Sequence, residues 1–220
     1  MNTPDSPPVS RYPGYDVLRK RDTPSWDAIT RKVIEERLAT PSDPRFLDAV
    51  QWRALEALCA CIAPQRRDRP QIPLAGMIDQ RLHKNAGDGF RYARLPPLRE
   101  AWRIGLAALD LESKALYALP FASIEPDAQH RLLKQMQHGE LASAHWHGMD
   151  PQLFFNQRVL PDIFGAYYAH PYAWNEIGFG GPANPRGYVR MYFDRRDPWE
   201  AAEAKPGKEH AALRDNQRVR

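Results

Sequence analysis

Apolar residues recur every three or four positions over most of this chain. The longest such stretch runs from Pro97 to about Leu119, and its spacing places the apolar side chains on one face of a helix. Shorter stretches of the same kind cover about 47–62, 73–82 and 126–139. The pattern predicts an all-α fold of about five to seven helices, packed as a single irregular bundle with little or no sheet. We expect the core to include Leu55, Leu58, Ile78, Trp102, Leu106, Leu132, Phe155 and Phe164.

Capping and breaking residues suggest where several helices begin and end. Thr23 followed by Pro24 is typical of a helix start, with Thr as the N-cap and Pro in the first turn. Gly139 is placed to end the helix that begins at Pro126. Pro161 falls inside the helix that starts after Asp150 and should kink it. The first helix is expected to turn these apolar residues inward: Trp26, Ile29, Val33 and Leu38.

Proline is abundant, with 21 residues in a chain of 220, and it gathers outside the helical patterns. We therefore expect a Pro-rich N-terminal arm over 1–22, a helical domain over 23–182 and a polar C-terminal arm over 183–220. The last 15 or so residues are strongly charged and are expected to fray.

The densest aromatic segment is Ala166–Pro182, which contains five aromatic rings, three glycines and two prolines. Gly and Pro interrupt regular structure, so this segment needs other parts of a protein to order it. One interpretation is a loop folded back onto its own core. The other is a segment that docks a partner chain, since Tyr and Trp are favoured at interfaces.

The formal net charge is +4, and the basic residues are interspersed with acidic ones. That mild excess suits an acidic partner without requiring a nucleic acid, although a basic nucleic-acid-binding helical protein remains one hypothesis. No apolar run approaches the roughly 20 residues of a membrane helix. Residues 1–10 show no apolar export signal and no twin arginine, so a cytoplasmic location is one alternative.

Local catalytic motifs are weak. The group Gly178-Phe-Gly-Gly181 lacks the spacing and the strand–turn–helix setting of a dinucleotide loop, and Cys59-Ala-Cys61 is not a haem-attachment motif. Asp162 and Glu176 are carboxylates without an evident catalytic partner. His145, His147 and His170 offer imidazole ligands, so a stand-alone metal-binding enzyme that uses these three residues is an alternative hypothesis.

The aromatic segment is similar to the C-terminal signature of the gluconate 2-dehydrogenase subunit 3 family. In that signature a helix ends in Tyr-Tyr, a short turn with His or Asp before Pro follows, and Trp-x-x-Ile-Gly-Phe/Tyr-x-Gly completes it. The matching residues are Tyr167, Tyr168, His170, Pro171, Trp174, Ile177, Gly178, Phe179 and Gly181. The resemblance extends back to about Phe46, through Trp52–Cys59 and Ile62–Pro64.

The resemblance implies a non-catalytic small subunit without a cofactor of its own. Its expected partner is a large FAD-containing dehydrogenase of the glucose–methanol–choline type that oxidises a sugar, a sugar acid or a polyol. A multihaem cytochrome carrying haem c is a further expected partner, and the complex would lie at the periplasmic face of the inner membrane. The expected partner-binding residues, with Trp174 as the main anchor, are Tyr168, His170, Pro171, Tyr172, Trp174, Ile177, Phe179 and Gly181.

Overall fold

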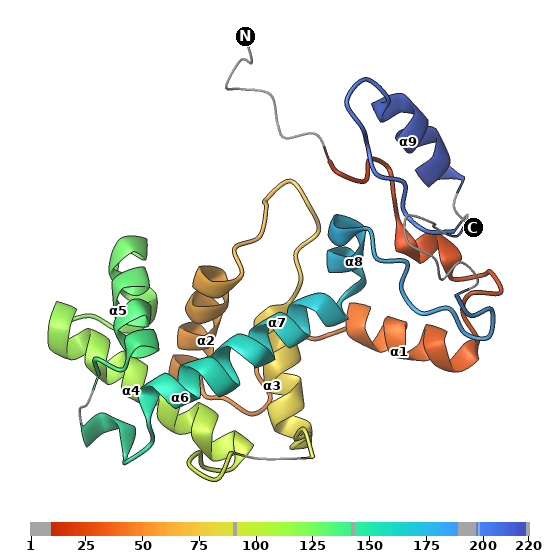
Figure 1. The fold of residues 1–220 in the computed structure, drawn as a ribbon. Coiled ribbons are helices and arrows are strands. Elements are labelled where there is room, and N and C mark those ends of the chain that lie inside the picture. Colours follow the sequence, from red (N-terminus) through yellow and green to blue (C-terminus); the bar gives the residue numbers. More distant parts are fainter. Residues whose placement is uncertain (1–9, 90–91, 142–143, 189–196, 198, 219–220) are drawn as a thin grey trace. The chain divides into compact units, whose positions relative to one another are not determined.

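A computed structural model describes residues 10–89, 92–141, 144–188, 197 and 199–218 (Figure 1). The described part of the chain is helical and has no strand, apart from one isolated bridge between Trp26 and Asn184. This confirms the all-α prediction. None of the described helices is both long and apolar enough to cross a membrane. The α-helices are α1 (Ala28–Leu38), α2 (Ala49–Ile62), α3 (Leu74–Lys84), α4 (Leu98–Tyr117), α5 (Pro126–His138), α6 (Pro151–Phe154), α7 (Leu160–Ala169), α8 (Pro171–Ile177) and α9 (Glu209–Gln217).

The chain divides into two compact units, whereas the sequence pattern predicted a single bundle over 23–182. The central unit is Thr40–Tyr167. The terminal unit combines the described residues of Met1–Ala39 and Tyr168–Arg220, so both expected arms contribute to it. Each unit has its own buried side chains, and each is described separately below.

The core of the central unit forms around α4. Trp102 is fully buried and meets the ring of Phe154 edge-on, with ring centroids 5.5 Å apart. Trp146, in the short 3₁₀ helix η3 (Ala144–Trp146), packs on the same ring at 6.3 Å. Gly105 leaves room for this ring, since a Cβ built there would lie 2.3 Å from Phe154. Seven of the eight predicted core residues are buried; Phe164 is the exception, with 39% of its surface exposed.

Buried acids tie loops to the helices of the central unit. The Asp79 carboxylate accepts hydrogen bonds from the backbone N–H groups of Arg45, Phe46 and Leu47, at 2.6–3.3 Å. Another 3₁₀ helix, η2 (Phe121–Ser123), is held by Asp110, whose Oδ1 accepts from the Phe121 N–H at 2.9 Å. The bonds from Leu47 and Phe121 satisfy backbone donors that would otherwise be buried without a partner.

A π-helical turn, η4 (Phe155–Val159), joins α6 to α7 just before Pro161. Proline has no N–H, so it cannot donate to the carbonyl of Gln157 one turn earlier. That carbonyl instead accepts a hydrogen bond from Nε of Arg158 at 2.8 Å. A π-helical turn thus precedes Pro161, where the sequence predicted a kink, and the freed carbonyl holds an arginine side chain.

Two predictions about the terminal unit were wrong. The helix α1 begins at Ala28 and not at Pro24, because the Asp27 carboxylate caps it by accepting from the Thr30 N–H at 2.7 Å. Its buried residue is Ile34, whereas Ile29 is 75% exposed. The last residues do not all fray either, since residues 209–217 form α9.

Asn216 explains why α9 is ordered. Its side chain is fully buried and binds the backbone at three points. Oδ1 accepts from the Ala202 N–H at 2.6 Å, while Nδ2 donates to the carbonyls of Ala202 and Pro13, both at 2.9 Å. These contacts join three separate segments of the terminal unit.

Two helical glycines provide a paired test of packing in the central unit. We expect Gly105→Ala to lower the free energy of unfolding by about 1–3 kcal/mol, because its methyl group would overlap the Phe154 ring. Gly165→Ala, where no atom lies within 4 Å of the new Cβ, should instead stabilise the protein by about 0.5–1 kcal/mol. Urea denaturation measures both. Equal effects would contradict this account of the α4 core.

Candidate functional site

The segment expected to bind a partner forms the end of α7, a sharp turn and the short helix α8. His170 is the N-cap of α8, where its Nδ1 accepts from the Tyr172 N–H at 3.3 Å. Pro171 occupies the first helical turn, where its missing N–H costs nothing. The two aromatic rings of His170 and Tyr172 lie 4.7 Å apart. The His-Pro pair therefore starts a helix in place of an irregular loop.

Trp174 lies in the interior of the terminal unit, with 3% of its surface exposed. Its indole N–H donates to the Tyr168 carbonyl at 2.7 Å, and the Arg37 guanidinium lies 5.9 Å from the ring centroid. The Phe179 ring meets it edge-on at 5.6 Å. Its buried neighbours in this cluster are Tyr15, Val17, Trp26, Ile34 and Ala201.

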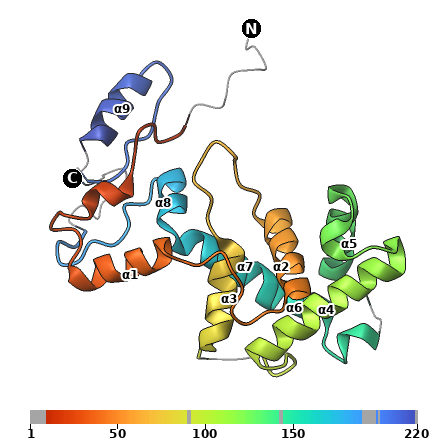
Figure 2. The same ribbon diagram turned by 180° about the vertical axis from the view of Figure 1, so that it is seen from behind.

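Residues 16–26 hold the α8 segment through hydrogen bonds to its backbone and to Asn175. The 3₁₀ helix η1 (Val17–Lys20) contacts α8, and the Val17 N–H donates to Asn175 Oδ1 at 2.8 Å (Figures 1 and 2). Trp26 donates its indole N–H to the Pro182 carbonyl at 3.0 Å. The buried ammonium of Lys20 donates to the carbonyl of Gly180. Burial lowers the pKa of Lys20 to about 8, although the charges of Glu200 and Asp197 oppose this shift.

Two glycines of the segment allow this close packing. Gly178 ends α8 with φ of 70°, and a Cβ there would lie 2.4 Å from the Tyr12 ring. Gly181, with φ of 67°, would place a Cβ 3.0 Å from Val17 and 3.1 Å from Trp174. Side chains of this chain thus fill the space around Gly178 and Gly181.

The predicted partner-binding residues separate into two groups. His170, Pro171, Trp174 and Gly181 are buried, and Tyr172 is half-buried. Tyr168, Ile177 and Phe179 are 44–50% exposed. The interior position of Trp174 removes it as a surface anchor. The interpretation as a segment folded onto its own core therefore describes the buried half, and docking stays a prediction for the three exposed side chains.

The metal-binding alternative has no ligand set in the residues that the structure describes. No three His, Cys, Asp or Glu side chains among them come together as a metal site. His170 serves as the N-cap of α8, and His147 lies in a turn with φ of 50°. His145 lies in η3.

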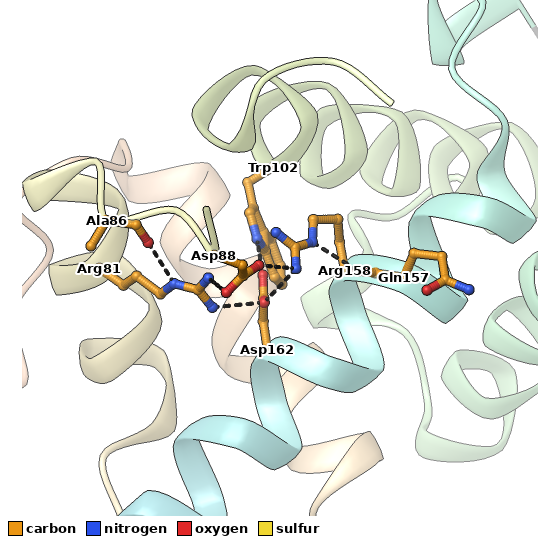
Figure 3. Close-up of polar contacts among 7 residues, drawn as sticks. All are labelled: Arg81, Ala86, Asp88, Trp102, Gln157, Arg158 and Asp162. Atoms are coloured by element: carbon orange, nitrogen blue, oxygen red, sulfur yellow. Dashed lines mark hydrogen bonds and ion pairs between the residues drawn. The ribbon is translucent and has the colours of Figure 1, made fainter. Parts of the chain in front are cut away.

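A buried acid in the central unit is the strongest candidate for acid–base chemistry (Figure 3). Asp162, on α7, accepts from the Trp102 indole N–H at 2.8 Å. Its other oxygen lies 2.9 Å from the guanidinium of Arg81 and 3.3 Å from that of Arg158. Burial raises the pKa of Asp162 despite these partners. Asp88 pairs with both arginines from the opposite side and completes the network.

This network is built for structure rather than for catalysis. The Asp162 side chain is 3% exposed, and both of its oxygens already have partners within the chain. A general acid or base must reach a proton of the substrate, and the buried Asp162 carboxylate is not accessible to one. From the sequence alone, Asp162 was interpreted as a carboxylate without an evident catalytic partner. Its spacing of four residues from Arg158 was a local signal for the pair, whereas no local signal pointed to Arg81 or Asp88.

The lowered pKa of His170 predicts how the stability of the terminal unit depends on pH. Burial, with a smaller contribution from the charge of Arg37, lowers the pKa of His170 from 6.5 to about 4. Between these values the unfolded chain binds a proton that the folded chain does not, so stability should fall as the pH falls from 6.5 to 4. The loss should be on the order of 2 kcal/mol. His170→Asn keeps an N-cap without titrating, and denaturation curves across this range should show its dependence reduced.

Asp162 gives a test of the buried network. Asp162→Ala should cost about 3–5 kcal/mol, because two arginines and an indole N–H would lose a buried acceptor. Asp68→Ala removes an exposed ion pair with Arg66 and should cost less than about 1 kcal/mol. Both are measured by urea denaturation, and a cost for Asp162→Ala as small as that of the control would refute this role.

Of three comparisons with known proteins, one gave a match. No match was found among curated proteins or solved structures. A family model described as gluconate 2-dehydrogenase subunit 3 matches residues 49–181, which is more than half of the chain. The match begins at the first residue of α2 and ends at Gly181, so it includes the whole aromatic signature. This chain belongs to the gluconate 2-dehydrogenase subunit 3 family.

Proposed function

We propose that this chain is the small accessory subunit of an FAD-dependent dehydrogenase of the glucose–methanol–choline type. In this role it binds the large flavin-bearing subunit and stabilises, assembles or helps to export it. The substrate of that partner would be a sugar, a sugar acid or a polyol. The observation that carries the proposal is the family match over residues 49–181, since the family is named as a subunit of gluconate 2-dehydrogenase.

The exposed half of the aromatic signature is the proposed contact surface. Ile177 and Phe179 flank Gly178 at the C-terminal end of α8, and both are exposed. Phe179 rests edge-on against the buried Trp174, which limits its motion. Large apolar side chains that are already held in place lose little conformational entropy on binding, so they suit an interface. Tyr168, near the end of α7, adds a third exposed side chain.

The redox cofactors belong, in this proposal, to the partner chains. FAD would lie in the large subunit and haem c in a cytochrome subunit, with the complex at the periplasmic face of the inner membrane. The glycines of the signature support this division of roles, because Gly178 and Gly181 pack against Tyr12, Val17 and Trp174 of the same chain. They serve to fold the terminal unit.

Purification of the tagged chain at its native expression level tests the proposal. We expect a large chain with flavin absorbance to co-purify, and dye-linked dehydrogenase activity to follow that chain. Mass spectrometry identifies it. Recovery of the tagged chain without any flavoprotein, or dehydrogenase activity in the tagged chain alone, would refute an accessory role.

Substitutions in α8 and just after it should separate docking from folding. Phe179→Ala and Ile177→Ala should weaken capture of the flavoprotein, by about 1–2 kcal/mol each, and leave the melting temperature of the lone chain nearly unchanged. Trp174→Ala should instead lower the melting temperature, since removing a buried Trp costs about 3–5 kcal/mol. Thermal melting and a quantitative pull-down are measured on all three variants. If Phe179→Ala melts early and still captures the flavoprotein normally, its ring is a core element and not a contact.

A further inference from the structure

A solvent-open pocket lies in the central unit, between α2 and the connection that leads to α3. It encloses about 470 Å³, within the range typical of binding sites. Both ribbon views show this connection extending past the ends of α2 and α3 (Figures 1 and 2). The floor of the pocket is apolar and includes Cys59, Ala63 and Ile72, all buried. Neither the Asp162 network of Figure 3 nor the aromatic signature contributes a residue to this pocket.

The side chains at the rim of the pocket are of the kinds that dominate protein interfaces. Trp52 is half-exposed and lines the pocket from α2, one turn before Glu56. Arg67 lines it from the connection and is exposed. Among the residues that the structure describes, neither the Trp52 indole N–H nor the Arg67 guanidinium has a hydrogen-bond or ion-pair partner. Trp and Arg are enriched among the residues that carry binding energy.

Side-chain hydrogen bonds hold the connection between α2 and α3 in place, and Arg67 takes no part in them. The Gln65 side-chain amide pairs in both directions with the backbone of Ile72, at 2.7 and 2.9 Å. The Gln71 side chain donates to the carbonyls of Arg66 and Arg69, at 2.7 and 2.9 Å. Because this wall of the pocket is already ordered, it loses little conformational entropy when a partner binds.

The charge of the rim indicates what would bind. Three arginines and one aspartate stand in the connection, at 66–69; of these Arg67 lines the pocket, and Glu56 is the other charged residue among the described lining residues. Asp68 is already paired with Arg66 through two contacts of 2.6 and 2.9 Å, which leaves Arg67 to face an incoming group. Opposite, the Glu56 carboxylate can accept from an N–H or O–H donor.

We propose that this pocket receives a segment of the partner protein in which a large apolar side chain is flanked by acidic residues. The apolar side chain would fill the hollow against Trp52 and Ile72. An acidic neighbour would pair with Arg67, and a backbone N–H would donate to Glu56. The inference rests on the proposed accessory function and adds a second contact, on the central unit, to the one proposed for Tyr168, Ile177 and Phe179.

Position 60 allows the pocket to be blocked without disturbing the fold. Ala60 is exposed and lines the pocket, so Ala60→Phe should fill the hollow from the solvent side. Ala60→Ser changes the same position and leaves the pocket open. Arg67→Glu reverses the rim charge, and Arg131→Glu reverses an exposed arginine on α5 outside the pocket. Thermal melting of each variant checks that the chain remains folded.

The experiment measures the affinity of each purified variant for the flavin-bearing chain recovered with the wild type. We expect Ala60→Phe and Arg67→Glu to weaken binding at least about tenfold, with Ala60→Ser and Arg131→Glu close to wild type. Hydrogen exchange should also show protection of residues 64–76 in the complex. Wild-type affinity for Ala60→Phe or Arg67→Glu would overturn the pocket proposal and leave the accessory function standing. Failure of the wild type to bind any flavoprotein would remove both.

Other occupants of the pocket would be recognised in the lone chain. A small molecule would add mass to the wild type in native mass spectrometry and be missing from Ala60→Phe. A second copy of the chain would appear in sedimentation as a dimer that Ala60→Phe dissociates. Either result would overturn the assignment of this pocket to a partner segment.

Discussion

The hydrogen bond from Trp102 to Asp162 is the contact on which the central unit depends. An indole ring in a closed core must place its N–H against an acceptor, and a carboxylate in the same place must find positive charge. Trp102 and Asp162 satisfy each other at 2.8 Å, and Arg81 and Arg158 supply the charge. Three separate elements, α3, α4 and the helix around Pro161, are fixed in position by this one requirement.

Pro161 contributes to the same arrangement through the backbone. Its missing N–H frees the Gln157 carbonyl, and Nε of Arg158 takes that carbonyl as an acceptor. The guanidinium then faces Asp88 and Asp162, at 2.7 and 3.3 Å. Pro161 disturbs the helix locally, and in doing so it helps to orient the ion pairs of Arg158.

Sequence reasoning succeeded where the determinants are local. Gly139 ends α5 in the left-handed region, and Pro126 begins it, because both effects come from the residues themselves. It failed at Thr23, whose hydroxyl donates to the Lys20 carbonyl while Asp27 caps α1. Both residue types are favoured as N-caps, and Asp is somewhat better than Thr, so the Thr-Pro pair alone did not locate the start of the helix. The family was recognised because the order of residues in the aromatic signature is specific.

The parts of the candidate site that escaped prediction depend on distant segments. Trp174 looked like a surface anchor, since its buried neighbours Tyr15, Trp26 and Ile34 stand more than a hundred residues earlier. The helix α9 looked like a frayed tail because Asn216 bonds to Ala202 and Pro13, contacts that no local pattern reveals. Phe164 fits the helical repeat yet is exposed, and its neighbours on α7 fill the interior instead.

The family match ends at Gly181, yet most of what packs against its last fourteen residues lies outside it. Tyr12, Val17, Lys20 and Trp26 all precede the matched region. The signature is therefore not a portable module. A chimera that grafts residues 168–181 onto a relative would have to carry the segment from Tyr12 to Trp26 with it, or the grafted tryptophan would lose its pocket. Changes in one segment over evolutionary time would have to be matched in the other.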